Sequence, residues 1–326
     1  MTQTTLAAPA ARDLPQLGGQ LFLTDGGLET TLLFHDGVDL ACFAAIDMFR
    51  KPGGREHLER YFEGYLALAR EAGTGFVLES ATWRASPDWA EPLAMTLAEL
   101  AEHNREAIAM LLDLRARHQS AAMPIVVSGC IGPRGDGYDP GELMSAGEAE
   151  AYHAWQARIF ADAGADMIAA ITITNAPEAI GIVRAAQDVG LPAAISFTVE
   201  TDARLPTGQT LAQVIAEVDA ATEGGPAYYM VNCAHPTHFA SALAAGDDWT
   251  DRIRGLRANA SKLSHAELDG MEELDTGDPD AFGHEHGELL ARLPQLAVLG
   301  GCCGTDLRHV GAIARAALAN GAAPGR

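Results

Sequence analysis

The sequence predicts a single-domain (β/α)₈ TIM barrel, and three features of its 326 residues support this fold class. Short apolar runs alternate with longer amphipathic stretches along the whole chain, as in parallel strands joined by helices. Polar residues gather where the apolar runs end, which is where barrels of this class carry their chemistry. No change of composition marks a domain boundary. We expect residues 16–326 to form the barrel and the small, polar residues 1–15 to form a disordered leader.

Eight runs have the length and composition of strands that are buried on both faces. Sequence with helical character follows each of them, which favours a closed barrel over a doubly wound sheet. The expected strands are residues 21–25, 75–79, 125–129, 167–171, 194–198, 228–232, 256–260 and 296–300.

Amphipathic stretches between these runs predict helices over residues 56–72, 96–118 and 147–163. Glycine or proline marks most returns to a strand, as at Gly73. Residues 261–286 are irregular, acidic and rich in Gly and Asp. They predict a long active-site loop after the seventh strand or, alternatively, a surface insertion.

Composition excludes several classes of partner. A formal net charge of −22 is opposite to the basic face that nucleic acid requires. No apolar run approaches the roughly 20 residues that span a bilayer, and the N-terminus lacks the order of a secretory signal. We therefore expect a cytoplasmic protein that acts on small molecules, and the sequence leaves open whether it forms a homo-oligomer.

The five cysteines, an odd number, do not suggest a disulfide framework. Cys233 ends the sixth expected strand, and Cys302 and Cys303 end the eighth. With one strand between them, their backbones are about 10 Å apart at about 4.8 Å per strand, so inward-leaning side chains can meet. Three thiolates would hold zinc and leave one coordination position open, as in catalytic zinc sites. The alternative for any cysteine is that it packs as a small buried hydrophobe. We favour this alternative only for Cys42 and Cys130.

Further polar residues, together with two glycines, stand at strand ends and are candidate substrate contacts. They share the position just inside or after a strand end. They are Asp25, Gly26, Gly27, Glu79, Thr172, Thr198 and Asn232.

Seven segments, spread over most of the chain, together resemble the homocysteine S-methyltransferase family. The Asn-Cys and Gly-Gly-Cys-Cys segments are the most specific. In order, the segments are TDGGLETTL (24–32), TWRAS (82–86), SGCIGP (128–133), AGADMIAA (163–170), SFTVETDARLPTGQTL (196–211), VNCAHP (231–236) and GGCCGT (300–305).

The resemblance implies a zinc-dependent enzyme that transfers a methyl group to the thiol of homocysteine and forms methionine. It implies an onium donor such as S-methylmethionine, S-adenosylmethionine or betaine. Cys233, Cys302 and Cys303 match the family's zinc ligands. The segment that holds the amino-acid end of homocysteine is matched by Asp25, Gly26 and Gly27.

Three further side chains are candidates for holding the substrates. Trp83 and Phe43 lie near positions where the family has aromatic residues, and an aromatic face attracts an onium cation. Arg84 replaces a glutamine common in relatives and would pair with a substrate carboxylate. The alternatives are ordinary packing for the aromatic rings and a surface ion pair for Arg84.

The acceptor pocket departs from the family pattern at the fourth strand. The family has a glutamate before Thr172, where it binds the ammonium group of the substrate, and this chain has Ile171. Either Glu29 or Glu79 replaces that charge, or the acceptor is a different thiol without an α-amino group. A non-catalytic zinc or thiol sensor is a further alternative. A zinc hydrolase is disfavoured because three thiolates make a bound water a poorer acid.

Histidines occur near both ends of the irregular region. His284 and His286 are expected to open the final helix and to be solvated, whereas His235 and His238 are expected at the pocket mouth. None of them is assigned a proton transfer.

Overall fold

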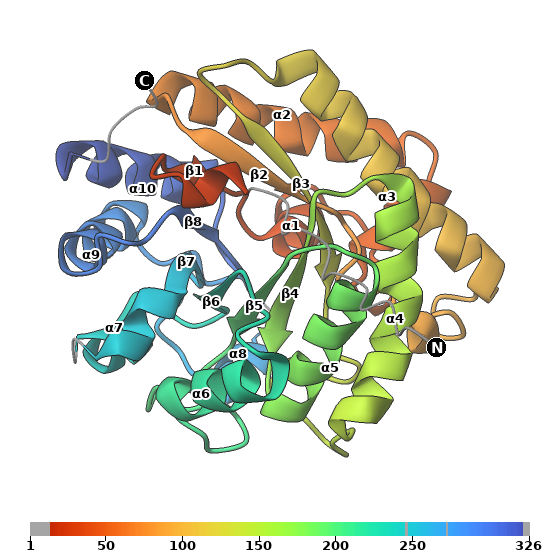
Figure 1. The fold of residues 1–326 in the computed structure, drawn as a ribbon. Helices are drawn as coiled ribbons and strands as arrows, with labels where there is room; N and C mark the ends of the chain where they lie inside the picture. The colour runs from red at the N-terminus through yellow and green to blue at the C-terminus, as the bar shows by residue number, and fades with distance from the viewer. Residues whose placement is uncertain (1–13, 245–246, 272, 322–326) are drawn as a thin grey trace, which may run out of the picture.

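The computed structural model describes residues 14–244, 247–271 and 273–321, which form one closed parallel barrel (Figure 1). Each strand pairs with the next in chain order, and β1 pairs with β8 to close the sheet. The predicted (β/α)₈ fold is therefore confirmed. The strands are β1 (Phe22–Leu23), β2 (Gly75–Glu79), β3 (Ile125–Ile131), β4 (Met167–Ile173), β5 (Ala193–Phe197), β6 (Tyr228–Asn232), β7 (Ile253–Ala258) and β8 (Val298–Gly301).

Every expected strand overlaps an observed one, and β7 differs most from its expected bounds. It begins at Ile253, whereas the apolar run began at Leu256. Two arginines, Arg254 and Arg257, interrupt the apolar pattern of this strand. Arg257 is nevertheless buried, because its charge is paired inside the barrel.

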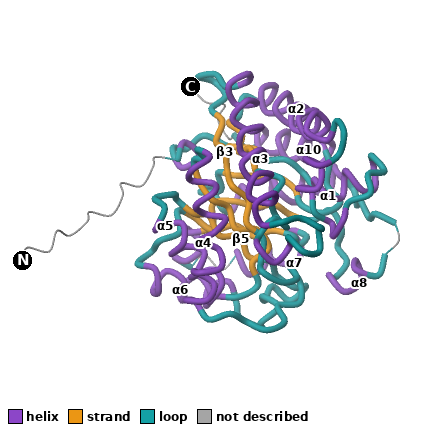
Figure 2. The backbone as a smooth tube through the Cα atoms, turned by 90° about the vertical axis from the view of Figure 1, so that its right-hand side faces the viewer, coloured by secondary structure: helices purple, strands orange, loops and turns teal. Residues whose placement is uncertain are grey.

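A ring of helices covers the outside of the barrel, as Figure 2 shows with strands in orange and helices in purple. Capping boxes begin several of them, for example at Thr96, Ser145 and Thr210. The outer helices are α2 (Gly54–Ala72), α3 (Leu97–His118), α4 (Ala146–Ala163), α5 (Ala176–Asp188), α6 (Leu211–Thr222), α7 (Pro236–Leu243), α9 (Pro279–Arg292) and α10 (Leu307–Ala319). Two short helices, α1 (Leu28–Thr30) and α8 (His265–Asp269), lie in the loops after β1 and β7.

The amino end of the barrel is closed by the residues just before β1. Gln16 is fully buried, and its Nε2 atom lies 3.2 Å from Sδ of Met167 and 3.5 Å from the Tyr228 hydroxyl. Leu14 is buried in the same interior cluster. The predicted leader thus extended too far, since Leu14 and Pro15 belong to the barrel. Its residues 1–13 lie outside the described residues.

The expectation for His284 and His286 was wrong in two respects. Both lie within α9, which precedes β8 and is not the final helix. His284 is exposed, but His286 is fully buried with Nδ1 2.8 Å from the Phe282 carbonyl oxygen. Among the described residues, no helix is long and apolar enough to cross a membrane.

Candidate metal centre and active site

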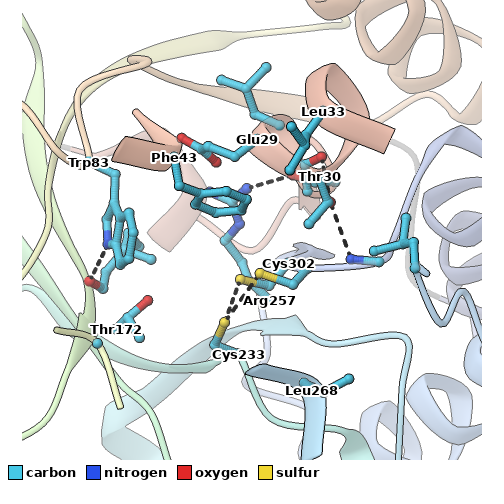
Figure 3. A pocket seen from close by; sticks show the side chains of 18 of the residues that line it. Glu29, Thr30, Leu33, Phe43, Trp83, Thr172, Cys233, Arg257, Leu268 and Cys302 are labelled. Carbon is cyan, nitrogen blue, oxygen red and sulfur yellow. Dashed lines mark hydrogen bonds between the residues drawn. The ribbon is translucent and has the colours of Figure 1, made fainter. Parts of the chain in front are cut away.

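Three cysteine side chains meet at the carboxyl end of the barrel, as the sequence predicted (Figure 3). The Sγ atom of Cys233 lies 3.1 Å from that of Cys302 and 3.7 Å from that of Cys303. All three sulfur atoms lie within 4.8 Å of one another. No other cluster of this kind occurs in the described part of the chain.

The local backbone turns these side chains toward one another. Cys233 has a left-handed backbone (φ 55°), so its side chain departs from the alternation of strand β6. The other two cysteines are held beside β7, because the Cys302 N–H donates to the Ala258 carbonyl (2.8 Å) and the Cys303 carbonyl accepts from the Ala260 N–H (3.1 Å). Glycine is required at 301, since a Cβ there would lie 1.9 Å from Oγ1 of Thr305.

The electrostatics of the thiols favour a bound cation. Hydrogen bonds from Cys233 and Cys303 hold the pKa of Cys302 well below its usual value. Hydrogen bonds to Cys233 and then to Cys302 raise the pKa of Cys303 well above its usual value, and a hydrogen bond to Cys302 raises that of Cys233. One negative charge is thus stabilised and further charges are opposed. Three thiolates in this space require a positive ion, and sulfur ligands fit a thiophilic divalent metal.

A set of side chains that the sequence analysis did not identify supports Cys233. The Tyr138 hydroxyl, from the loop after β3, lies 3.0 Å from Sγ of Cys233. The ring of Tyr138 stacks on that of His265 with centroids 4.0 Å apart. His265 contacts the Cys233 carbonyl oxygen through Nε2 (2.6 Å) and Glu200 through Nδ1 (2.9 Å). Asn259 Nδ2 also donates to the Cys233 carbonyl (3.1 Å). Because these residues come from three separate segments, after β3, β5 and β7, sequence spacing carried no signal for them.

The cysteines face a cavity of about 430 Å³ at this end of the barrel. Most of the predicted substrate contacts line it. These are Asp25, Gly26, Gly27, Glu29, Phe43, Glu79, Trp83, Arg84 and Thr172. The long region after β7 also lines it through Ser261, Leu268 and Asp275, so this region is an active-site loop rather than a surface insertion.

Two predicted contacts lie behind the cavity wall. Asn232 is fully buried; its Nδ2 donates to Oγ1 of Thr172 (2.8 Å), and its Oδ1 accepts from the Thr172 N–H (2.9 Å). It therefore fixes Thr172, which has a left-handed backbone (φ 66°). Thr198 is fully buried and does not line the cavity. Neither residue is among those that line the cavity, but Nδ2 of Asn232 lies 3.8 Å from Sγ of Cys302.

A strained turn places Phe43 in the cavity. Cys42 and Phe43 both have left-handed backbones, with φ of 56° and 54°. Such non-glycine positions cost about 1–3 kcal/mol each and cluster at functional sites. Nη1 of Arg84 donates to the Cys42 carbonyl (2.7 Å), and its guanidinium lies over the rings of Trp83 and Trp89. Arg84 therefore supports this turn, in addition to lining the cavity.

A buried arginine joins two of the acidic residues at the strand ends. Nη2 of Arg257 lies 2.7 Å from Oδ1 of Asp25, and its Nη1 pairs with Glu79. Tyr61 donates a further hydrogen bond to Asp25 (3.0 Å). Burial raises the pKa of Glu79 to about 7 and raises that of Asp25, while Arg257 opposes both shifts. The sequence analysis missed Arg257, although a charged residue within a buried strand does indicate a buried partner.

Glu29 differs from these acids. It lines the cavity from α1 and forms no ion pair within the part of the chain that the structure describes. Burial, followed by the nearby Cys302 and Asp25, raises its pKa to about 7, and hydrogen bonding to its own backbone opposes the shift.

His235 and His238 do not line the cavity, contrary to the expectation that they stand at its mouth. His235 is buried, and its Nε2 lies 3.2 Å from Glu285. Burial lowers the pKa of His235 to about 3. It therefore belongs to the packing between α7 and α9.

The fold and the site together are those of a (β/α)₈-barrel enzyme with a cluster of three cysteines at the carboxyl ends of its strands. The model of the homocysteine S-methyltransferase family matches residues 22–317, so the chain belongs to this family and is a methyltransferase that acts on small molecules.

Named relatives agree with this assignment. Homocysteine S-methyltransferase 4 of Zea mays is 28% identical over 95% of this chain and 93% of its own length. Homocysteine S-methyltransferase 1 of Arabidopsis thaliana is 23% identical over 93% of this chain and 95% of its own length. Among solved structures, the metallated form of the homocysteine methyltransferase MmuM from Escherichia coli superposes with a TM-score of 0.69, covers 91% of this chain and 96% of its own, and is 19% identical. The apo form of the same enzyme gives a TM-score of 0.65 at 20% identity. The match covers 94% of this chain and 98% of that structure's chain. These structural matches support the barrel fold.

Proposed function

We propose that this protein is a zinc-dependent S-methyltransferase that uses an onium donor and the thiol of homocysteine to form methionine. The observation that carries the proposal is the convergence of three cysteine Sγ atoms, within 4.8 Å of one another, on the wall of a substrate-sized cavity. The names of the plant relatives support homocysteine as the acceptor. A different thiol is the alternative, because Ile171 replaces the acid expected at β4.

Cys233, Cys302 and Cys303 would hold the zinc ion, and the crowding of their thiols is the reason that a cation fits there. When bound, zinc would lower the pKa of the acceptor thiol and keep its sulfur at a defined position. The metallated form of the Escherichia coli relative supports a metal at this site.

The methyl transfer itself requires no acid or base from the protein. The sulfur of the acceptor, which has lost its proton on binding, forms a bond to the methyl carbon. The bond from that carbon to the sulfonium sulfur or ammonium nitrogen of the donor breaks, and its electron pair stays on that sulfur or nitrogen, which becomes uncharged; the thiol proton has already gone to solvent. The protein contributes by aligning the two substrates and by excluding water.

Two aromatic side chains would hold the donor. Trp83 and Phe43 line the cavity, and an onium cation over each ring gains roughly 0.5–2 kcal/mol. The Trp83 ring is fixed because its Nε1 donates to the Ile171 carbonyl (3.0 Å). S-methylmethionine, S-adenosylmethionine and betaine all carry the required charge.

The segment after β1 would hold the amino-acid end of the acceptor. A Cβ at Gly27 would lie 2.6 Å from the Cys302 carbonyl oxygen, so only glycine allows this segment to pack against the cysteine loop. Asp25, Gly26 and Gly27 are consequently next to the proposed metal centre. Thr172 lines the same cavity and would contact the acceptor from β4.

A reducing compartment such as the cytoplasm suits this chemistry. All five cysteines are free, and an oxidised cluster could not bind zinc. Because the proposed product is methionine, we assign the enzyme to methionine biosynthesis.

The test combines metal analysis with methyl transfer. We expect about one zinc ion per chain and labelled methionine from homocysteine with at least one of the three donors. Cys302→Ala should lose both zinc and transfer. Cys130→Ala is the matched control, because Cys130 lines the cavity but is outside the cluster, and it should retain zinc.

Two outcomes would contradict the proposal. Purified protein without stoichiometric zinc, or full transfer by Cys302→Ala, would remove the metal centre from the reaction. Tight zinc binding without methyl transfer to any thiol would instead indicate that the protein is a non-catalytic zinc or thiol sensor.

A further inference from the structure

We propose that Glu29 binds the α-ammonium group of the acceptor and so selects amino-acid thiols over thiols that lack this group. The inference rests on the proposed thiol methyl transfer and assigns to Glu29 the charge that Ile171 does not supply. It follows from how the acids at this end of the barrel are paired.

Two of the candidate acids already share one cation. Asp25 and Glu79 both pair with the guanidinium of Arg257, and all three side chains are buried. Nε of Arg257 also donates to the Gly301 carbonyl (3.1 Å), so the arginine is held between β8 and the two acids. An ammonium group that approached Asp25 or Glu79 would have to share the carboxylate with this arginine. Glu79, one of the two replacements that the sequence left open, is therefore already engaged in an ion pair.

Glu29 is the cavity-lining acid that remains without a cation beside it. Its side chain forms no hydrogen bond or ion pair with another residue in the described ranges, and its own backbone is its hydrogen-bonding partner. A carboxylate withdrawn from water without a partner is costly, and a cationic ligand would recover that cost. Of the other acids that line the cavity, Asp136 lies 3.6 Å from Arg84, Asp275 accepts a hydrogen bond from Ser261 (2.6 Å), and Asp269 and Glu273 are exposed.

The position of Glu29 relative to the thiols is fixed by the residues on either side of it. Gly27 packs against the Cys302 carbonyl, and Oγ1 of Thr30 accepts a hydrogen bond from the Gly304 N–H (3.3 Å). Helix α1 is thereby attached to the cysteine loop at both ends. Figure 3 shows Glu29 on α1 at the cavity, with Phe43 beside it and the cysteine sulfurs on the far side of that ring. Glu29 and the three cysteines line the same cavity, so one ligand in it can contact both.

The ligand class follows from this arrangement. The acceptor carries a thiol at one end and an ammonium group a few bonds away, as homocysteine does. The same molecule without its amino group, 4-mercaptobutanoate, would leave Glu29 desolvated and unpaired.

The experiment compares these two thiols in wild type and in Glu29→Gln, an isosteric change that removes the charge. Loss of a charge-assisted hydrogen bond should raise KM for homocysteine about 10- to 100-fold. KM for 4-mercaptobutanoate should stay within about twofold, because that thiol makes no such contact. Asp269→Asn is the matched control and should change neither value.

Binding without turnover provides a second readout. The fluorescence of Trp83, which lines the cavity, should report the Kd of each thiol on zinc-loaded protein in the absence of donor. Wild type should bind homocysteine more tightly than 4-mercaptobutanoate, and Glu29→Gln should abolish the difference. Equal changes for both thiols, or none for either, would overturn the role of Glu29. If the wild type transfers methyl to neither thiol, the proposed function fails, while the difference in Kd still decides whether Glu29 binds the ammonium group.

Discussion

Two walls of the cavity are held in place by different kinds of interaction. On the metal wall, Cys233, Cys302 and Cys303 are brought together by backbone geometry, namely a left-handed residue, a close-packed glycine and hydrogen bonds to β7. On the acid wall, Asp25 and Glu79 are held by the charge of Arg257, and Glu29 forms no ion pair within the described part of the chain. We infer that changes on the metal wall act on metal retention, whereas changes on the acid wall act on stability, pH dependence and the choice of acceptor.

The largest effect on stability should come from the acid wall. Arg257→Met would leave two buried carboxylates without their cation, and breaking a buried ion pair in this way costs about 3–5 kcal/mol. We expect a corresponding loss in the free energy of unfolding measured in urea. The double variant Arg257→Met/Glu79→Gln should recover part of the loss, and no recovery would mean that the arginine acts through packing instead of charge.

A smaller effect is expected on the metal wall from Tyr138→Phe. This change removes the hydroxyl that lies 3.0 Å from Cys233 Sγ and keeps the ring that stacks on His265. Loss of such an outer hydrogen bond lowers metal affinity by about 10- to 100-fold. Competition with a chelator measures the affinity, and a shift of the sulfur-to-metal absorption band in cobalt-substituted protein would show that the thiolate itself has changed.

Tyr152→Phe is the control for Tyr138→Phe, since the Tyr152 hydroxyl bonds Ser86 (2.9 Å) away from the cysteines. It should leave both the zinc affinity and the cobalt spectrum unchanged. An equal loss of affinity in the two variants would argue against a specific contact with Cys233.

The smallest effect should be a gain of stability in Glu29→Gln. The pKa of Glu29 is raised from 4.5 to about 7 by burial, so the folded state binds this proton more tightly than the unfolded state. Wild type therefore loses stability as the pH rises from 4.5 to 7, and the penalty is complete above pH 7. Glu29→Gln should be more stable than wild type by about 1–3 kcal/mol at pH 8 and by much less at pH 4.5. Urea unfolding at the two pH values tests this, and an advantage that is equal at both would exclude the carboxylate charge as its source.

Sequence patterns predicted the metal wall better than the acid wall. The Asn-Cys end of one strand and the Gly-Gly-Cys-Cys end of another indicated the sulfur cluster, because the order of strands in a closed barrel fixes which strand ends are neighbours. The same patterns gave no partner for Arg257, since the residues it joins come from the first and second strands and are far from it in the chain. For the same reason Tyr138 and His265 were not identified at Cys233.

The amino-acid sequence by itself determined the eight-stranded barrel and the convergence of the cysteines, because strand periodicity and strand order are local or topological properties. Only the tertiary structure decided that Arg257 pairs with both Asp25 and Glu79, that Asn232 and Thr198 are buried outside the cavity lining, and that Glu29 lines the cavity with no ion pair among the described residues. Pairing between charges and the burial of single side chains depend on which atoms meet in space, and residues distant in the chain supply those atoms.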